Sequence, residues 1–476
     1  MPSVRHSVSF LLFIVLGYCC ISVGTPTAER GVTWSKAFPF SVEDERELGE
    51  TVFKQIQKQM VFVRVSAVQA YVDSLGRKLT SNADRSEFPI RFFVLRESEP
   101  NAFAIPAGRI FLTSGLIMLV QTEDELAGVM AHEIAHVVRR HIAERIEASK
   151  RLNLTTLAGL LAGMFVGGSE GGAIMAGSLA FSEAKKLEYT RENESEADRL
   201  GLAYVTRAGY EGYGLVSFLK KIHRSTQHNP AFPSYLSTHP GVPERISYLE
   251  TLMGGPPEST ERVRSSDGLK DIRLRLLIVE KGPLDSLDYF TDLLQTEPDR
   301  GDALFGRALA AIELGRVKQS IEDLKRAHLL KPEDPQILKV LGLAFIRVGR
   351  VDEGVRALER SLSLSGKDAE TLYYLGQGYQ TQKRLPQAIE SYLKAGQLYA
   401  DLPELHRNLG SAYREKGEMG RSHYHYGIYF KQKGDLRYAR FHFEKALELL
   451  NQDPQKQDEI LRELKELKNE KHRSPG

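Results

Sequence analysis

The chain has only two cysteines in 476 residues, and both lie in an apolar stretch near the N-terminus. If that stretch is removed on export, the mature chain has no thiol. Disulfide bonds and thiolate ligands are then excluded, so any metal site has to be built from histidine and carboxylate side chains. The length and the hydrophobic content of 42% support two or three domains with cores of their own.

The chain also lacks an excess of charge of either sign. It has 64 basic and 62 acidic side chains, which give a formal net charge of +2. This balance gives no reason to expect a nucleic-acid partner, and no block of like charge is long enough to bind a polyanion.

Long hydrophobic runs are scarce, and the main one opens the chain. Residues 1–24 are interpreted as an export signal, with Arg5 and His6 before the apolar stretch "SFLLFIVLGYCCI" and small residues before a cut after Gly24. Residues 25–40 are interpreted as a linker. The alternatives are a retained anchor and lipid attachment at Cys19 or Cys20, which Tyr18 disfavours because a small residue is expected there.

The motif "HEIAH" has the form H-E-x-x-H and lies in a predicted helix. Thr122 and Glu125 form a capping-box start, and apolar residues follow with helical period. Positions four apart on a helix differ by about 40°, so His132 and His136 can converge on one ion. The chemistry indicated is zinc held by both imidazoles, with Glu133 as general base. The alternative is a chance motif on a surface helix, which the apolar surroundings and the preceding strand-like segments disfavour.

His141 is excluded as a third ligand by its spacing. It lies nine positions after His132 and would point about 180° away from it on a continuous helix. Together with Arg139 and Arg140 it predicts a solvated basic face near the helix end. The third ligand therefore has to come from elsewhere in the chain.

The acidic segment "RENESEADRLGLAYV" supplies candidates for that ligand. Glu194 and Asp198 are four apart on a predicted helix and share a face, so one can bind zinc while the other accepts a hydrogen bond from a ligand imidazole. The alternative, an acidic helix start favoured by the helix dipole, explains Glu192 and Glu196. It does not explain an aspartate that enters the apolar face.

HEIAH followed later by ESEAD resembles the HtpX and CAAX-prenyl-protease family of gluzincins, whose pattern is HExxH followed by E-x-x-A-D. The stretch "NAFAIPAGRIFLTSGL" also resembles the strand and turn before the zinc helix of that family. The likeness covers roughly residues 40–250. It implies one Zn²⁺ per chain, with Glu194 as third ligand and Asp198 as the hydrogen-bond partner of a ligand.

The same resemblance gives roles to "THPGVPER" farther along. In soluble relatives a His-Pro pair followed by an arginine lies beside the zinc. His239 is then a fourth ligand in a closed state or a stabiliser of the reacting oxyanion, and Arg245 is its electrostatic partner. Tyr235 is a lesser candidate for that role. The alternative is a loop histidine before Pro240 and an arginine that caps the last helix.

Residues 41–255 predict an α+β zincin-type metallopeptidase domain, mostly helical with a small sheet. A buried strand is expected at 88–95 and a hairpin at 101–115. An extended substrate would pair along an edge strand. Residues 152–181, rich in glycine and alanine, are interpreted as two packed helices around a mobile loop, with a membrane-dipping segment as the alternative. The residues expected on the edge strand are Asn101, Ala102, Phe103 and Ala104.

The C-terminal part repeats every 34 residues, which is typical of tetratricopeptide units. Each unit has a small residue at its eighth place: Ala308, Gly342, Gly376 and Gly410. Residues 267–300 form a degenerate leading unit, and the charged residues 452–474 form a capping helix. An all-α tetratricopeptide solenoid over 267–476 is therefore predicted, with a groove that binds protein segments.

These observations predict an exported zinc endopeptidase that cleaves misfolded or stalled protein clients. The resemblance to soluble periplasmic relatives implies the periplasm and a part in outer-membrane protein assembly or quality control. The groove of the repeats would bind a protein partner, the outer-membrane assembly machinery being a candidate, and peripheral membrane association is a further option. The rival hypothesis is a non-catalytic or latent chaperone or scaffold whose zinc site is closed, since His239 could displace the water.

Overall fold

The computed structural model describes residues 40–149, 156–161, 189–228, 234–255, 267–399 and 402–473. The expected signal segment, nearly all of the expected linker, and most of the glycine- and alanine-rich segment lie outside these ranges. Within them, no helix combines the length and the apolar character that a membrane crossing needs.

Two helices open the N-terminal domain, which comprises the described residues from 40 to 255. Helix α1 (Val42–Gln59) begins in a capping box between Ser41 and Asp44, and it buries Leu48, Val52 and Ile56 at helical spacing. Helix α2 (Ser66–Thr80) buries one face in the same way. Their amphipathic period is what the sequence predicts for this region.

The sheet has three strands, β1 (Arg91–Leu95), β2 (Ala102–Ile105) and β3 (Arg109–Thr113), in the order β1-β3-β2. β1 is parallel to β3, and β2 is antiparallel to it, so the predicted buried strand and hairpin are confirmed. The hairpin turn needs left-handed backbone at Ala107, with φ of 65°, and at Gly108, with φ of 79°. β2 is an edge strand of this sheet, and it faces the helices that follow.

Helix α4 is the central element of the N-terminal domain and is buried over almost its whole length. Thr122 accepts a hydrogen bond from the Glu125 backbone at 3.1 Å and fixes its start. A Cβ at Gly201 would lie 3.1 Å from the backbone nitrogen of His132, so α9 can cross α4 closely there because residue 201 is glycine. The helices of this part are α3 (Ser114–Leu119), α4 (Glu123–Val138), α5 (His141–Ser149), α9 (Arg191–Arg207), α10 (Tyr213–His228), α11 (Ser234–Thr238) and α12 (Val242–Leu252).

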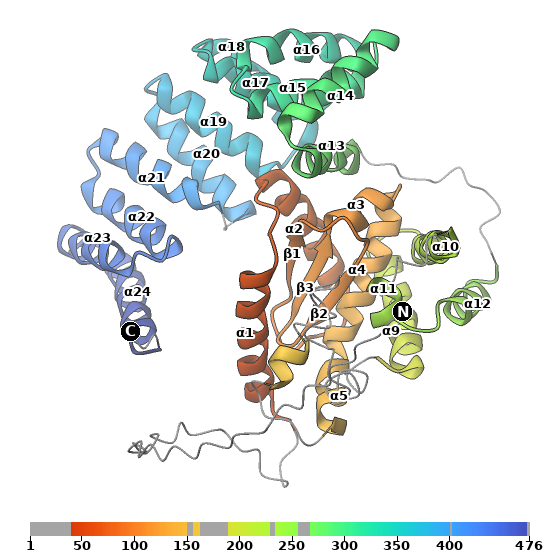
Figure 1. The fold of residues 1–476 in the computed structure, drawn as a ribbon. Helices are drawn as coiled ribbons and strands as arrows, with labels where there is room; N and C mark the ends of the chain where they lie inside the picture. Colours follow the sequence, from red (N-terminus) through yellow and green to blue (C-terminus); the bar gives the residue numbers. More distant parts are fainter. Residues whose placement is uncertain are drawn as a thin grey trace, which may run out of the picture.

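The repeat array, residues 267–473, consists of paired helices. The first helices of the four predicted units begin at Gly301, Pro335, Ala369 and Pro403, which are 34 residues apart. The array starts at α13 (Asp267–Lys281), next to α2 and α3, and curves from there to its last helices on the side of α1 (Figure 1). Its helices are α13 (Asp267–Lys281), α14 (Pro283–Thr296), α15 (Gly301–Glu313), α16 (Val317–Leu330), α17 (Pro335–Arg347), α18 (Val351–Ser365), α19 (Ala369–Thr381), α20 (Leu385–Leu398), α21 (Pro403–Lys416), α22 (Met419–Gln432), α23 (Leu436–Leu449) and α24 (Pro454–Arg473).

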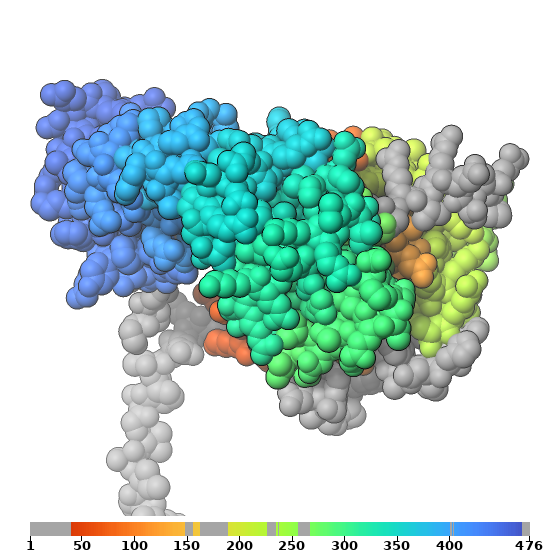
Figure 2. All heavy atoms as spheres, turned by 90° about the horizontal axis from the view of Figure 1, so that it is seen from above, coloured from red at the N-terminus to blue at the C-terminus, as the bar shows by residue number. Residues whose placement is uncertain are grey.

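Helix α13 joins the array to the N-terminal domain. Leu269, Ile272 and Leu276 belong to the same buried apolar cluster as the residues of α2 and α4. The Ser114 hydroxyl donates to a carboxylate oxygen of Glu280 at 2.7 Å. Seen from above, the array crosses this face of the molecule from α13 and α14 (green) to its last helices (blue) (Figure 2). Helix α13, the first helix of the array, is thus part of the hydrophobic core of the N-terminal domain.

A cavity of about 320 Å³ lies beside this junction, between α2 and the array. Charged residues form part of its lining, among them Asp271, Lys339 and Glu370. Lys339 on α17 is buried and pairs with Glu370 on α19 at 2.9 Å. Asp271 on α13 pairs with the half-buried Arg275 at 3.0 Å. Apolar packing by α13 and buried ion pairs therefore occur side by side where the two parts meet.

Truncation of Leu276 tests the role of α13. Leu276→Ala should lower the free energy of unfolding of the full chain by about 2–5 kcal/mol, since the side chain is fully buried in the shared core. The matched control is Leu329→Ala, at a leucine that is 78% exposed, and it should change stability by less than about 0.5 kcal/mol. Urea denaturation followed by circular dichroism measures both. Equal effects of the two substitutions would contradict the packing of α13 on the N-terminal domain.

Candidate metal centre

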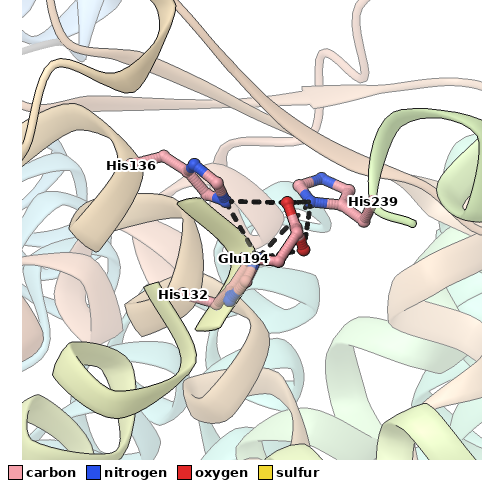
Figure 3. Close-up of side chains that lie close together, drawn as sticks. All are labelled: His132, His136, Glu194 and His239. Atoms are coloured by element: carbon pink, nitrogen blue, oxygen red, sulfur yellow. Dashed lines mark hydrogen bonds and ion pairs between the residues drawn. The ribbon is translucent and has the colours of Figure 1, made fainter. Parts of the chain in front are cut away.

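Four side chains from three segments converge in the interior of the N-terminal domain. His132 and His136 come from α4, Glu194 from α9, and His239 from the residues after α11, and all four are buried (Figure 3). One ligand atom from each lies within 4.8 Å of the others. The capping box between Thr190 and Asn193 fixes the start of α9, which puts Glu194 in the first turn, facing α4.

The donor atoms are spaced as ligands of a single ion. His132 Nε2 and His136 Nε2 are 3.0 Å apart, and each lies 3.4 Å from a carboxylate oxygen of Glu194. His239 Nδ1 lies 3.0 Å from Glu194 Oε1. Imidazole nitrogens and a carboxylate, without thiolate, suit Zn²⁺. Burial lowers the pKa of His136 well below its usual value.

Glu133 lies next to these donors without being one of them. Its Oε1 is 3.3 Å from His239 Nε2, and neither of its oxygens accepts a hydrogen bond from a described residue. Burial raises the pKa of Glu133, more than the neighbouring positive charges lower it. A buried carboxylate with a raised pKa has the proton affinity expected of a general base.

Asp198 contacts His132, the first of the candidate ligands, through Nδ1 of its ring. His132 Nδ1 donates to Asp198 Oδ1 at 2.9 Å, which leaves Nε2 of that ring for a metal. Burial and Arg245 lower the pKa of His132, but Asp198 and Glu194 outweigh them and raise it to about 9. Asp198 therefore contacts a candidate ligand, and its role as the partner of that ligand stays a prediction.

Arg245 lies among the carboxylates. Its Nε donates to Asp198 at 2.8 Å, and its Nη1 pairs with Glu194 at 2.6 Å. Burial alone would raise the pKa of Glu194, but Arg245 and the nearby histidines hold it well below its usual range. Among the described residues, the contacts of Arg245 are to the two carboxylates and to His132, and its expected pairing with His239 is not among them.

His239 is held between two aromatic rings and against the edge strand. Tyr235 stacks on it with ring centroids 4.6 Å apart, and Tyr189 lies at 5.5 Å on a tilted plane. His239 Nε2 lies 3.4 Å from the backbone oxygen of Ala102 on β2. Phe103 and Ala104 of this strand are buried, and so is Asn101 directly before it. The predicted edge strand thus passes directly beside the candidate metal centre.

Tyr189 was not predicted from the sequence. Its ring stacks on His136 with centroids 3.8 Å apart, which is closer than its approach to His239. The only sequence signal is its position directly before Thr190, the residue that caps α9. That position places Tyr189 at the entry of the ligand-bearing helix.

The prediction for His141 was wrong. The side chain is 1% exposed rather than solvated. Helix α4 ends at Val138, and Arg140 takes a left-handed conformation with φ of 54°, so His141 begins a new helix, α5. Its Nδ1 lies 3.0 Å from Nδ1 of His136. The predicted angle of about 180° assumed a continuous helix, which the chain does not form.

Comparison with known proteins identifies two parts of the chain. Residues 66–253 match the model of peptidase family M48. Residues 282–336 and 340–403 match a tetratricopeptide repeat model. The first match contains all four side chains of the candidate metal centre, and the second covers most of the predicted repeat units.

Proteases of bacteria and of mitochondria are similar to part of this chain. The beta-barrel assembly-enhancing protease of Escherichia coli K12 is 29% identical over 294 residues, 60% of this chain and 59% of its own. That of Yersinia pestis is 31% identical over 210 residues, 44% and 43% of the two chains. The mitochondrial metalloendopeptidase OMA1 of Schizosaccharomyces pombe is 24% identical over 230 residues, 48% and 65%. The chain thus spans about half the length of these curated relatives.

Removal of Glu194 tests the ligand set. Glu194→Ala should lower the zinc content of the purified full chain strongly, because the carboxylate lies within reach of both α4 imidazoles. Glu192→Ala, at an exposed residue of the same helix turn, is the control and should leave zinc content unchanged. Metal analysis by mass spectrometry measures both. Near-stoichiometric zinc in Glu194→Ala would remove Glu194 from the ligands and favour Glu196 or Asp198.

Proposed function

Because residues 66–253 form a domain of peptidase family M48, we propose that the chain is an exported zinc-dependent endopeptidase that cleaves misfolded or stalled protein clients. The observation that carries this proposal is the convergence of His132, His136 and Glu194 with Glu133 beside them. The names of the bacterial relatives support a part in outer-membrane protein assembly or quality control. The periplasm is the proposed location.

The residues of the site divide the chemistry among them. Zinc held by the two α4 histidines and Glu194 would polarise the scissile carbonyl and lower the pKa of a water molecule. Glu133 would act as general base toward the attacking water and as general acid toward the leaving amine, which its raised pKa favours. Asp198 keeps the His132 ring in the tautomer with Nε2 free.

The edge strand β2 would orient the substrate. An extended client segment can pair with its backbone and so lie across the metal centre, as in strand addition. The Ala102 oxygen is the point on β2 where the structure shows an imidazole within 3.4 Å. The repeat array would hold the client or a partner protein through its groove, since arrays of this kind bind protein segments.

The conformation of the structure supports a resting state that is closed. The His239 ring lies near Glu194 through Nδ1, and near Glu133 and the Ala102 oxygen through Nε2. In this position it would occupy one ligand position on the metal and would also cover the proposed general base and a backbone group that could pair with substrate. Four protein ligands leave no open position on zinc. The second candidate function, a latent chaperone or scaffold, rests on this same observation.

Substitution of the proposed base separates the two functions. Glu133→Gln should abolish cleavage of an unfolded protein and leave zinc content unchanged, because the glutamine has no basic oxygen and Glu133 is not a ligand. Glu147→Gln, at an exposed residue of α5, is the control and should cleave as the wild type does. Gel-based cleavage and metal analysis measure the outcome. Equal and negligible cleavage by the wild type and Glu133→Gln would favour the scaffold.

Removal of His239 tests the closed state. His239→Ala should raise basal cleavage or self-cleavage while zinc stays bound by His132, His136 and Glu194, since the ring occupies the groups that a substrate needs. His328→Ala, on α16 of the repeat array, is the control and should show no change. Time courses of cleavage with parallel zinc analysis measure it. A fall of about 100-fold would instead assign His239 to oxyanion stabilisation.

A further inference from the structure

We propose that His141 and Glu196 form a positioning relay that fixes the ring and the tautomer of His136. The proposal rests on the proposed function only in taking His136 as a metal ligand. Neither residue of the relay touches the metal or the substrate. They would act on His136 alone, by holding its ring in the orientation and the tautomer that leave Nε2 free for the metal.

The contacts run in one line from α9 to α4. Glu196 Oε2 accepts a hydrogen bond from His141 Nε2 at 3.1 Å. His141 Nδ1 then carries no proton and accepts a hydrogen bond from His136 Nδ1 at 3.0 Å. With its proton on Nδ1, His136 has Nε2 free, and this is the nitrogen that lies 3.0 Å from His132 Nε2 in the metal centre.

The two α4 histidines are thereby held in parallel ways by α9. Asp198 accepts directly from His132 Nδ1 at 2.9 Å. For His136 the carboxylate stands one ring farther away, because an imidazole is inserted between them. Ligand histidines ordinarily donate their second nitrogen to an acceptor that sets ring orientation and basicity. Glu196 reaches His136 through His141 to the same end.

The turn between α4 and α5 positions His141 next to His136. Arg140 is one of only a few non-glycine residues in the described ranges with positive φ, at 54°. Its Nε donates to Glu45 Oε2 at 2.7 Å, and Glu45 is buried on α1. This anchor supports a backbone conformation that L-residues avoid. The turn ends α4 and starts α5, and His141 Nδ1 then lies 3.0 Å from His136 Nδ1.

Two other roles for His141 conflict with the geometry. A metal ligand would have to face Nε2 of His136, whereas His141 faces Nδ1 on the opposite side of that ring. A side chain that only fills space would not need two polar partners in line. Arg139 also pairs with Glu196, at 2.8 Å, which holds the carboxylate at the end of the relay.

The test compares zinc affinity of full-length variants by competition with a chromophoric chelator. His141→Phe keeps the ring volume but has no acceptor, and it should weaken zinc binding by about 10–100-fold. His141→Asn places an amide oxygen near the position of Nδ1 and should keep most of the affinity. Glu196→Ala should weaken binding, and Glu192→Ala, on the same helix and exposed, should not.

A role in packing alone predicts the reverse order, with His141→Phe close to the wild type and His141→Asn weakened, and that result would overturn the proposal. Circular dichroism checks folding of each variant. If His141→Phe does not fold, Glu196→Ala and the tautomer of His136 decide. In the full chain labelled with ¹⁵N-histidine, nitrogen–proton correlation spectra should show His136 protonated at Nδ1, and protonation at Nε2 would contradict the relay.

Failure of the proposed function looks different from failure of the relay. A wild-type chain that binds no zinc, or binds it without Glu194, removes the metal centre itself. Zinc binding that depends on Glu194 but is unaffected by His141→Phe and Glu196→Ala removes only the relay.

Discussion

The two buried carboxylates of the candidate metal centre depend on one buried guanidinium group, that of Arg245. Arg245 faces the two carboxylates Glu194 and Asp198, and all three side chains are almost wholly removed from water. Two buried anions without this partner would carry a large desolvation cost, and loss of one member of such a network typically costs about 3–5 kcal/mol. The interaction also ties α12, which carries Arg245, to α9. Through this interaction, α12 stabilises the position of the candidate ligands on α4 and α9.

The sequence predicted the parts of this arrangement that follow from regular helix geometry. His132 and His136 share a helix face, Glu194 and Asp198 share another, and the structure brings these faces together. The hairpin and the helix starts 34 residues apart were also accessible, because turn residues and repeat period are local signals. The roles expected of His239 and Arg245 came from family resemblance. His239 lies next to Glu194 among the candidate ligands, whereas Arg245 contacts Glu194, Asp198 and His132 rather than His239.

What could not be predicted depends on a single backbone conformation and on tertiary contacts. Arg140 has left-handed backbone directly after α4 and so prevents the helix from continuing. This conformation could not be predicted from the residue type, because arginine rarely has positive φ. The buried place of His141 follows from that turn. Glu196 looked like part of an acidic helix start because its partner lies 55 positions away along the chain. The packing of α13 on the N-terminal domain is likewise invisible to a repeat period, which reports only similarity between units.

The closed position of His239 has a consequence for discrimination between clients. In the proposed enzyme, each substrate would have to displace an imidazole that is stacked on Tyr235 and lies 3.4 Å from the Ala102 oxygen of β2, so the free energy of opening would be subtracted from every binding event. If the closed form outnumbers the open one about 100 to 1, the apparent dissociation constant of every client rises about 100-fold. Segments that pair weakly or briefly then fall below the threshold of engagement, whereas long, persistent contacts exceed it. At a given client concentration, such an enzyme would engage only the segments whose own affinity offsets this factor, while the ratio between the affinities of two clients stays the same.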